Sequence, residues 1–141
     1  LSYIRDENEN GPMHAIAISH VNKRITLCFR GSETAEDWGQ NLKSTLSKIG
    51  NVSVHAGFYE YLDGIYDGLK EKICDVLNEH PSFEFYVTGH SLGGALATLF
   101  AYRFVKDTND VARPMKCITV GAPHVGDRAF QDAFEGRYNS I

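Results

Sequence analysis

The stretch from Phe85 to Phe104, FYVTGHSLGGALATLFAYRF, decides the fold of this chain. Its first part is short and nearly all apolar, which is typical of a strand that is buried in a parallel sheet. Its last part is apolar and rich in small residues, which indicates a helix that packs closely on the sheet. The segment Gly89–Gly93 joins them and fits the pattern G-x-S-x-G. Ser91 at its centre is either a catalytic nucleophile or an ordinary serine in a glycine-rich turn.

The residues around Ser91 favour a nucleophile. A strand-to-helix turn of this kind holds its serine in a strained backbone conformation and lifts the hydroxyl above the sheet edge. The strand and the helix approach closely only if the residues two before and two after the serine are tiny, and Gly89 and Gly93 occupy these places. The N–H groups at the start of the helix carry a partial positive charge, which suits a developing oxyanion.

The composition of the 141-residue chain is that of one globular domain. Hydrophobic residues make up 43% and charged residues 23% of it, which is enough apolar material for a core. The net charge of -4 gives no reason to expect a nucleic-acid partner or binding to an anionic membrane surface. The longest apolar run, Ala95–Tyr102, is too short to cross a bilayer, so we expect no transmembrane segment.

The three cysteines, Cys28, Cys74 and Cys117, have no spacing that suits a metal site or a redox pair. Each lies within an apolar segment. We therefore expect all three to be small buried hydrophobic residues.

Strand and helix patterns alternate along the rest of the chain. Two apolar runs, Met13–Ser19 and Arg24–Phe29, flank a predicted hairpin turn. Apolar residues recur at steps of three and four over residues 58–77, which predicts a long helix. A further strand follows Pro114, and Asp127 is expected to cap a last helix. This order indicates an α/β fold with a mainly parallel sheet.

Four motifs, in this order, resemble the class 3 or fungal-type lipases of the α/β-hydrolase superfamily. They are LCFRGSET, VHAGFYEYL, VTGHSLGGALA and TVGAPHVGDRAF, and the similarity runs from about Ile25 to Phe134. Four ordered motifs are far more specific than G-x-S-x-G alone. The resemblance implies an α/β-hydrolase fold, with a mainly parallel sheet flanked by helices.

The resemblance assigns roles to three residues. It implies that Ser91 is the nucleophile of an acyl transfer. It also implies that the N–H of Leu92, and the N–H and hydroxyl of Ser32, bind the oxyanion of the tetrahedral intermediate. The polar segment 31–41 predicts a loop and a short helix, and its part after Ser32 matches the lid of the family. Trp38 fits such a lid, and the alternative is that it packs on the core.

A serine nucleophile needs a base, and the chain order in α/β-hydrolases is Ser, then Asp or Glu, then His. The only histidine after Ser91 is His124. We expect it at the surface or lining a pocket. The less favoured alternative is that His124 is the base. Asp107 and Asp110 follow a helix, so they are expected at the opposite edge of the sheet. His55 is expected to be a hydrogen-bonded structural histidine.

The resemblance therefore implies that residues 1–141 form a single partial, C-terminally truncated lipase-like domain. This domain contains the nucleophile turn and lacks the segments that carry the acid and the histidine. We expect the chain by itself to be inactive.

The intact protein is expected to be a serine ester hydrolase that cleaves triacylglycerol or a related lipid through an acyl-enzyme on Ser91. The resemblance implies an acyl-ester lipid as substrate, met at a lipid–water interface, and neither a metal nor a cofactor. The family also includes phospholipase A1, diacylglycerol lipase and feruloyl esterase types, and the sequence leaves this choice open. The alternative is a non-catalytic lipase-like domain that binds lipid or a protein partner.

Overall fold

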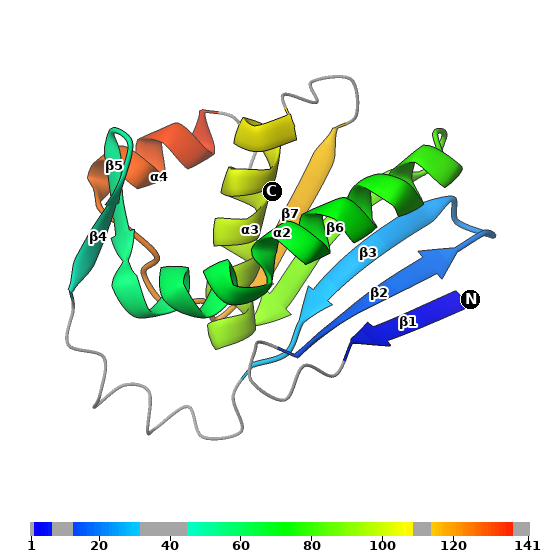
Figure 1. The fold of residues 1–141 in the computed structure, drawn as a ribbon, viewed down its shortest axis with the longest axis horizontal. Helices are drawn as coiled ribbons and strands as arrows, with labels where there is room; N and C mark the ends of the chain where they lie inside the picture. Colours follow the sequence, from blue (N-terminus) through cyan, green and yellow to red (C-terminus); the bar gives the residue numbers. More distant parts are fainter. Residues whose placement is uncertain (1, 7–12, 32–44, 109–113, 137–141) are drawn as a thin grey trace.

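The computed structural model describes residues 2–6, 13–31, 45–108 and 114–136 (Figure 1). The strands in these ranges are β1 (Ser2–Asp6), β2 (His14–Ser19), β3 (Arg24–Phe29), β4 (Leu46–Ile49), β5 (Val52–His55), β6 (Glu84–His90) and β7 (Met115–Val120). The helices are α2 (Ala56–Glu79), α3 (Leu92–Thr108) and α4 (Arg128–Glu135). The helix predicted over residues 58–77 and the helix predicted after Ser91 are thus both confirmed.

The larger sheet has the strand order β1-β2-β3-β6-β7. The first three strands pair antiparallel, and β2 and β3 form the predicted hairpin. β6 lies parallel to β3 on one side and to β7 on the other. The predicted α/β class is confirmed, and the sheet is mixed because an antiparallel meander precedes its parallel part.

Both long helices lie on one face of the larger sheet, with α3 over β6 and β7 and α2 beside α3 (Figure 1). Alternate side chains of β3 and β6 point into this layer and are buried: Ile25, Leu27, Phe29, Phe85 and Val87. Full burial of an apolar side chain of this size contributes about 1.5–3 kcal/mol, so this layer is the core of the described part.

Polar contacts also join α2 to α3. The guanidinium of Arg103 lies 3.7 Å from the ring centroid of Tyr66 and donates a hydrogen bond of 2.8 Å to Asp63. The buried hydroxyl of Tyr66 donates to Asp107 at 2.8 Å. Burial and this carboxylate raise the pKa of Tyr66 far above its ordinary value, so the hydroxyl keeps its proton.

No helix of the described ranges covers the other face of the larger sheet (Figure 1). Ile118 and Val120 of β7 are 45% and 61% exposed. In β6, buried residues alternate with half-buried ones such as Tyr86 and Thr88. The expected full burial of this strand is therefore found on one face only.

The expectation of three buried cysteines is wrong. Cys28 is exposed, and Cys74 and Cys117 are half-buried. Cys28 lies between Leu27 and Phe29 in β3, so the alternation of the strand turns its side chain toward the open face. An apolar run in a strand does not by itself predict burial when helices cover only one side.

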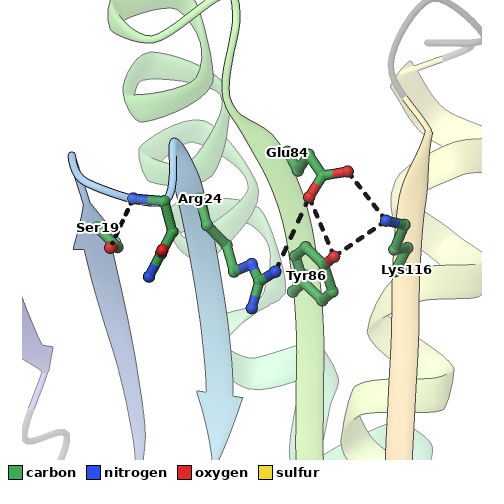
Figure 2. Close-up of polar contacts among 6 residues, drawn as sticks. Ser19, Arg24, Glu84, Tyr86 and Lys116 are labelled. Carbon is green, nitrogen blue, oxygen red and sulfur yellow. Dashed lines mark hydrogen bonds and ion pairs between the residues drawn. The ribbon is translucent and has the colours of Figure 1, made fainter.

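A polar cluster crosses three strands at the amino ends of the parallel strands (Figure 2). Lys116 donates to Glu84 at 2.9 Å and to the hydroxyl of Tyr86 at 3.0 Å. The guanidinium of Arg24 lies 4.2 Å from the ring centroid of Tyr86. Hydrogen bonds from Lys116 and Tyr86 hold the pKa of Glu84 below its ordinary value. The cluster thus links β3, β6 and β7 on the open face.

The turn between β6 and α3 is closed by contacts between backbone atoms. A Cβ atom at Gly89 would lie 2.2 Å from the carbonyl group of Gly93. A Cβ atom at Gly93 would lie 2.3 Å from the carbonyl oxygen of Phe29. Ser91 has a φ of 53°, in the left-handed region that non-glycine residues rarely adopt. The predicted strain at the serine and the predicted need for glycine are both confirmed.

A second, two-stranded sheet of β4 and β5 precedes α2, and the sequence analysis does not predict it. His55, at the end of β5, donates its backbone N–H to Val125 at 2.8 Å.

Asp127 caps α4 as predicted, because its carboxylate accepts from the N–H of Phe130 at 2.8 Å. It also accepts from the N–H of Ser53 at 3.1 Å. These backbone hydrogen bonds, led by that of Phe130, hold the pKa of Asp127 below its ordinary value.

We expect Gly89→Ala to lower the free energy of unfolding by about 3 kcal/mol or more, since the new methyl group must displace backbone. The matched control is Gly68→Ala on α2, where a Cβ atom meets nothing within 4 Å. This change should raise the free energy of unfolding by about 0.5–1 kcal/mol, because alanine loses less entropy in a helix. Urea denaturation measures both, and equal stability of the two variants would contradict the close approach at Gly89.

The cap at Asp127 predicts a pH dependence. A depressed pKa in the folded state means that the carboxylate stabilises the fold above its unfolded pKa of 3.8, and that this stability is lost as the pH falls through the folded pKa. We expect Asp127→Ala to be less stable than the parent at pH 7, with the difference shrinking below about pH 4. In thermal unfolding from pH 7 to pH 2.5, a difference that stays constant would show that the carboxylate charge has no part.

Candidate functional site

The carboxyl ends of β3, β6 and β7 meet at the edge of the larger sheet where α3 begins (Figure 1). Phe29, Gly89 and Thr119 are register partners across these three strands. The residues that follow each strand are therefore neighbours at this edge. In open α/β sheets, ligands bind outside the carboxyl ends of the strands.

Ser91 follows β6 directly and is fixed through its backbone on both sides. Its N–H donates to the carbonyl of Val120 at 3.0 Å. Its own carbonyl accepts from Gly94 at 2.9 Å and from Ala95 at 3.2 Å, which starts the first turn of α3. The end of β7 and the helix thus hold the serine in its left-handed conformation. The residue is half-buried, as a serine presented at a strand end should be.

Leu92 is the first residue of α3, and its side chain is buried. Helix geometry leaves the N–H of such a residue without an acceptor in its own helix. The first turn of α3 has no acidic side chain to offset the partial positive charge of the helix start. Negative charge that develops beside Ser91 would therefore be stabilised here.

The chain that leaves β3 passes against the same turn. A Cβ atom at Gly31 would lie 2.8 Å from the carbonyl oxygen of His90 and 3.7 Å from the Cβ of Ser91. Gly31 thus brings the chain beside the serine just before Ser32. Ser32 and Trp38 themselves lie outside the described residues.

The candidate partners of Ser91 lie in different places. His124 is exposed in the loop after β7, and within the described ranges it makes no hydrogen bond to Ser91. Asp107 is in the last turn of α3, roughly 24 Å from Ser91 at 1.5 Å per residue, and so lies toward the opposite edge as expected. Asp110 is outside the described residues.

His55 is not the hydrogen-bonded histidine that we expect from the sequence. Its Nδ1 atom is buried and has no hydrogen-bond partner among the described residues. Its ring packs on Phe58 with 4.3 Å between the centroids and 30° between the planes. The sequence around His55 could not predict these surroundings, because a backbone hydrogen bond to Val125, far along the chain, fixes the position of the residue.

Cys28 and Cys117 keep their protons at neutral pH. Burial raises the pKa of Cys117 to about 11, and partial desolvation of its thiol raises the pKa of Cys28, although that residue is exposed. Both therefore stay in the thiol form, whereas the thiolate is the reactive species.

In the described part of the chain, no three or more His, Cys, Asp or Glu side chains are grouped so that they could hold a metal ion. None of the described helices has the length and hydropathy needed to cross a membrane.

Comparison with known proteins connects this geometry to one family. The sequence profile of the family described as lipase (class 3) matches residues 26–141. A secreted mono- and diacylglycerol lipase of Fusarium solani is 33% identical over an alignment of 118 residues that covers 82% of this chain and 34% of that protein. A chloroplastic phospholipase A(1) of Arabidopsis thaliana is 33% identical over an alignment of 138 residues that covers 84% of this chain and 31% of that protein.

The solved structure of a triacylglycerol lipase, whose catalytic centre is described as a serine protease triad, superposes with a TM-score of 0.82. It is 27% identical, and the match covers 89% of this chain and 49% of that chain. This chain thus spans about a third of the length of the curated relatives that it matches. The fold is of the α/β-hydrolase type, and the chain belongs to the class 3 lipase family.

Proposed function

We propose that the protein containing this chain is a serine carboxylic-ester hydrolase that forms an acyl-enzyme on Ser91. The observation that carries this proposal is the strained turn between β6 and α3. Ser91 there has a φ of 53°, and Leu92 begins the helix directly after it. A backbone held in this way places the hydroxyl above the sheet and an N–H beside it.

The reaction has two stages. Ser91 Oγ attacks the ester carbonyl carbon, its proton passes to a base, and the carbonyl oxygen becomes an oxyanion. We assign the N–H of Leu92, together with the N–H and hydroxyl of Ser32, as donors to that oxygen. The intermediate then expels the alcohol and leaves the acyl group on Ser91. Water attacks this new ester, and the carboxylic acid leaves while Ser91 regains its proton.

We assign the acid and the base of the reaction to residues outside these 141. Two observations support this assignment: the chain covers about a third of its curated relatives, and no described histidine donates to or accepts from Ser91. Residues 1–141 are then a single partial domain, which is inactive by itself. His124, on the loop that follows β7, is the alternative base within this chain.

The substrate class follows from the relatives. Their names describe action on mono- and diacylglycerol, triacylglycerol and phospholipid, all of which are carboxylic esters of long-chain acids. We propose that the protein likewise cleaves an acyl-ester lipid and meets it at a lipid–water interface. The lid assigned to the segment after Ser32, with Trp38, would contact that interface.

Labelling with a fluorophosphonate tests the nucleophile, because this reagent reacts with a serine hydroxyl that a base and an oxyanion site activate. We expect the full-length protein to be labelled at Ser91 and the 141-residue chain to stay unlabelled. Ser91→Ala should abolish the labelling and lower ester hydrolysis by roughly 10⁴-fold or more.

The other outcomes each change the proposal. Labelling of the 141-residue chain at Ser91 would place the base within this chain, and His124→Ala would then identify it by losing the label. A folded full-length protein without label would contradict the hydrolase and favour a non-catalytic lipase-like domain that binds lipid or a protein partner. Circular dichroism of each form establishes that it is folded.

A further inference from the structure

Two histidines that the proposed hydrolysis does not use lie beside each other, where β6 begins. His20 is the first residue of the turn between β2 and β3, and His80 directly follows the last residue of α2. Their ring centroids are 5.4 Å apart, with 76° between the ring planes. His20 is exposed and His80 is half-buried, so the pair is open to solvent and to dissolved ions.

Backbone hydrogen bonds hold the two segments that carry these histidines. The N–H of Glu84 donates to the carbonyl of Lys23 at 2.8 Å, which joins the β2–β3 turn to the start of β6. The N–H of His80 donates to Leu77 at 3.3 Å, and its carbonyl accepts from Phe83 at 3.1 Å. Figure 1 shows the β2–β3 turn and the end of α2 at the same end of the molecule. The fold itself therefore brings the two histidines together.

Phe83 orients the imidazole of His80. The two rings are stacked, with 4.7 Å between the centroids and 24° between the planes. Phe83 is partly buried and packs against the core, and its ring centroid also lies 5.7 Å from that of His20. Side chains that are held in this way lose little freedom when a ligand binds.

The separation of the two imidazoles suits one metal ion. An imidazole nitrogen binds Zn²⁺ at about 2.0–2.1 Å. At the angles of tetrahedral or octahedral coordination, two imidazoles on the same ion then have their ring centroids roughly 4.5–5.5 Å apart. The 5.4 Å between His20 and His80 lies in this range. The two backbones thus already hold the rings at the separation that a shared ion requires.

We propose that His20 and His80 bind one divalent transition-metal cation of the kind that imidazole prefers, such as Zn²⁺ or Cu²⁺. The two imidazoles are the protein ligands, and water fills the other positions, because no group of three or more metal-ligating side chains is present in the described ranges. The bound ion connects the β2–β3 turn to the end of α2 and stabilises the folded protein.

This cation site is separate from the reaction at Ser91. β6 runs from Glu84, beside the histidine pair, to His90, which precedes the nucleophile. At roughly 3.3 Å per residue, the two ends of this strand are about 20 Å apart. The ion therefore takes no part in ester hydrolysis, and its effect is on stability.

Thermal unfolding of the full-length protein tests the site, with ZnCl₂ as the probe. We expect the Tm to rise by about 2–5 °C at a Zn²⁺ concentration tenfold above the Kd, because the ion binds the folded state. His20→Phe and His80→Phe should each abolish this rise. His124→Asn is the matched control: this histidine is exposed on the loop after β7, and its loss should leave the rise unchanged.

A copper chelate tests whether both imidazoles bind the same ion. Cu²⁺ bound to iminodiacetate keeps two neighbouring coordination positions for protein nitrogens. We expect the Kd of this chelate to rise at least about 10-fold in His20→Phe and in His80→Phe, since even the loss of a residue that only supports a metal ligand typically costs this much. The double variant should bind no more weakly than either single variant, because the site needs both ligands.

Two outcomes would overturn the proposal. A Tm rise and a chelate affinity that stay unchanged in His20→Phe and His80→Phe would show that the ion binds elsewhere. Small losses that add up across His20, His80 and His124 would show adventitious binding to independent surface histidines. Each Tm rise is measured against the same variant without metal, so a change in the basal stability of a variant does not affect the comparison.

Discussion

The rest of this structure depends on the contact between Gly89 at the end of β6 and Gly93 in the first turn of α3. Their backbones are so close that a single methyl group at Gly89 would lie 2.2 Å from a carbonyl group. Because no side chain separates them, α3 starts directly on the sheet, and the chain must reverse within two residues. Ser91 is the residue that absorbs this reversal, with a φ of 53°.

The same closeness arranges the neighbours of the serine. Gly93 meets the carbonyl of Phe29, so β3 is drawn to the start of the helix as well. At Gly31, a Cβ atom would lie 3.7 Å from the Cβ of Ser91, so the chain after β3 runs close to the serine. At the end of β7, the carbonyl of Val120 accepts a hydrogen bond from the N–H of Ser91. Contacts from three strands and one helix therefore fix the position of Ser91. A strained backbone conformation persists only when the surrounding structure holds it in this way.

Much of this could be predicted from the sequence because the signals are local. The apolar period of α2, the capping carboxylate of Asp127 and the glycines around Ser91 each act within a few residues of their own position. The features that could not be predicted depend on distant segments. Cys28 is exposed because the described helices cover only one face of its strand (Figure 1). The backbone of His55 is bonded to Val125, far along the chain, and its Nδ1 has no hydrogen-bond partner among the described residues.

The parallel pairing on both sides of β6 has a consequence for how the molecule folds. Arg24 pairs with Glu84, and all of α2 lies between them in the sequence. Phe85 pairs with Met115, and all of α3 lies between them in the sequence. Contacts of such long range must close large loops before they stabilise anything, so they form late and slowly. Ser91 gains the neighbours that hold its conformation only when both pairings exist. The turn at Ser91 therefore takes its final form only when folding is complete.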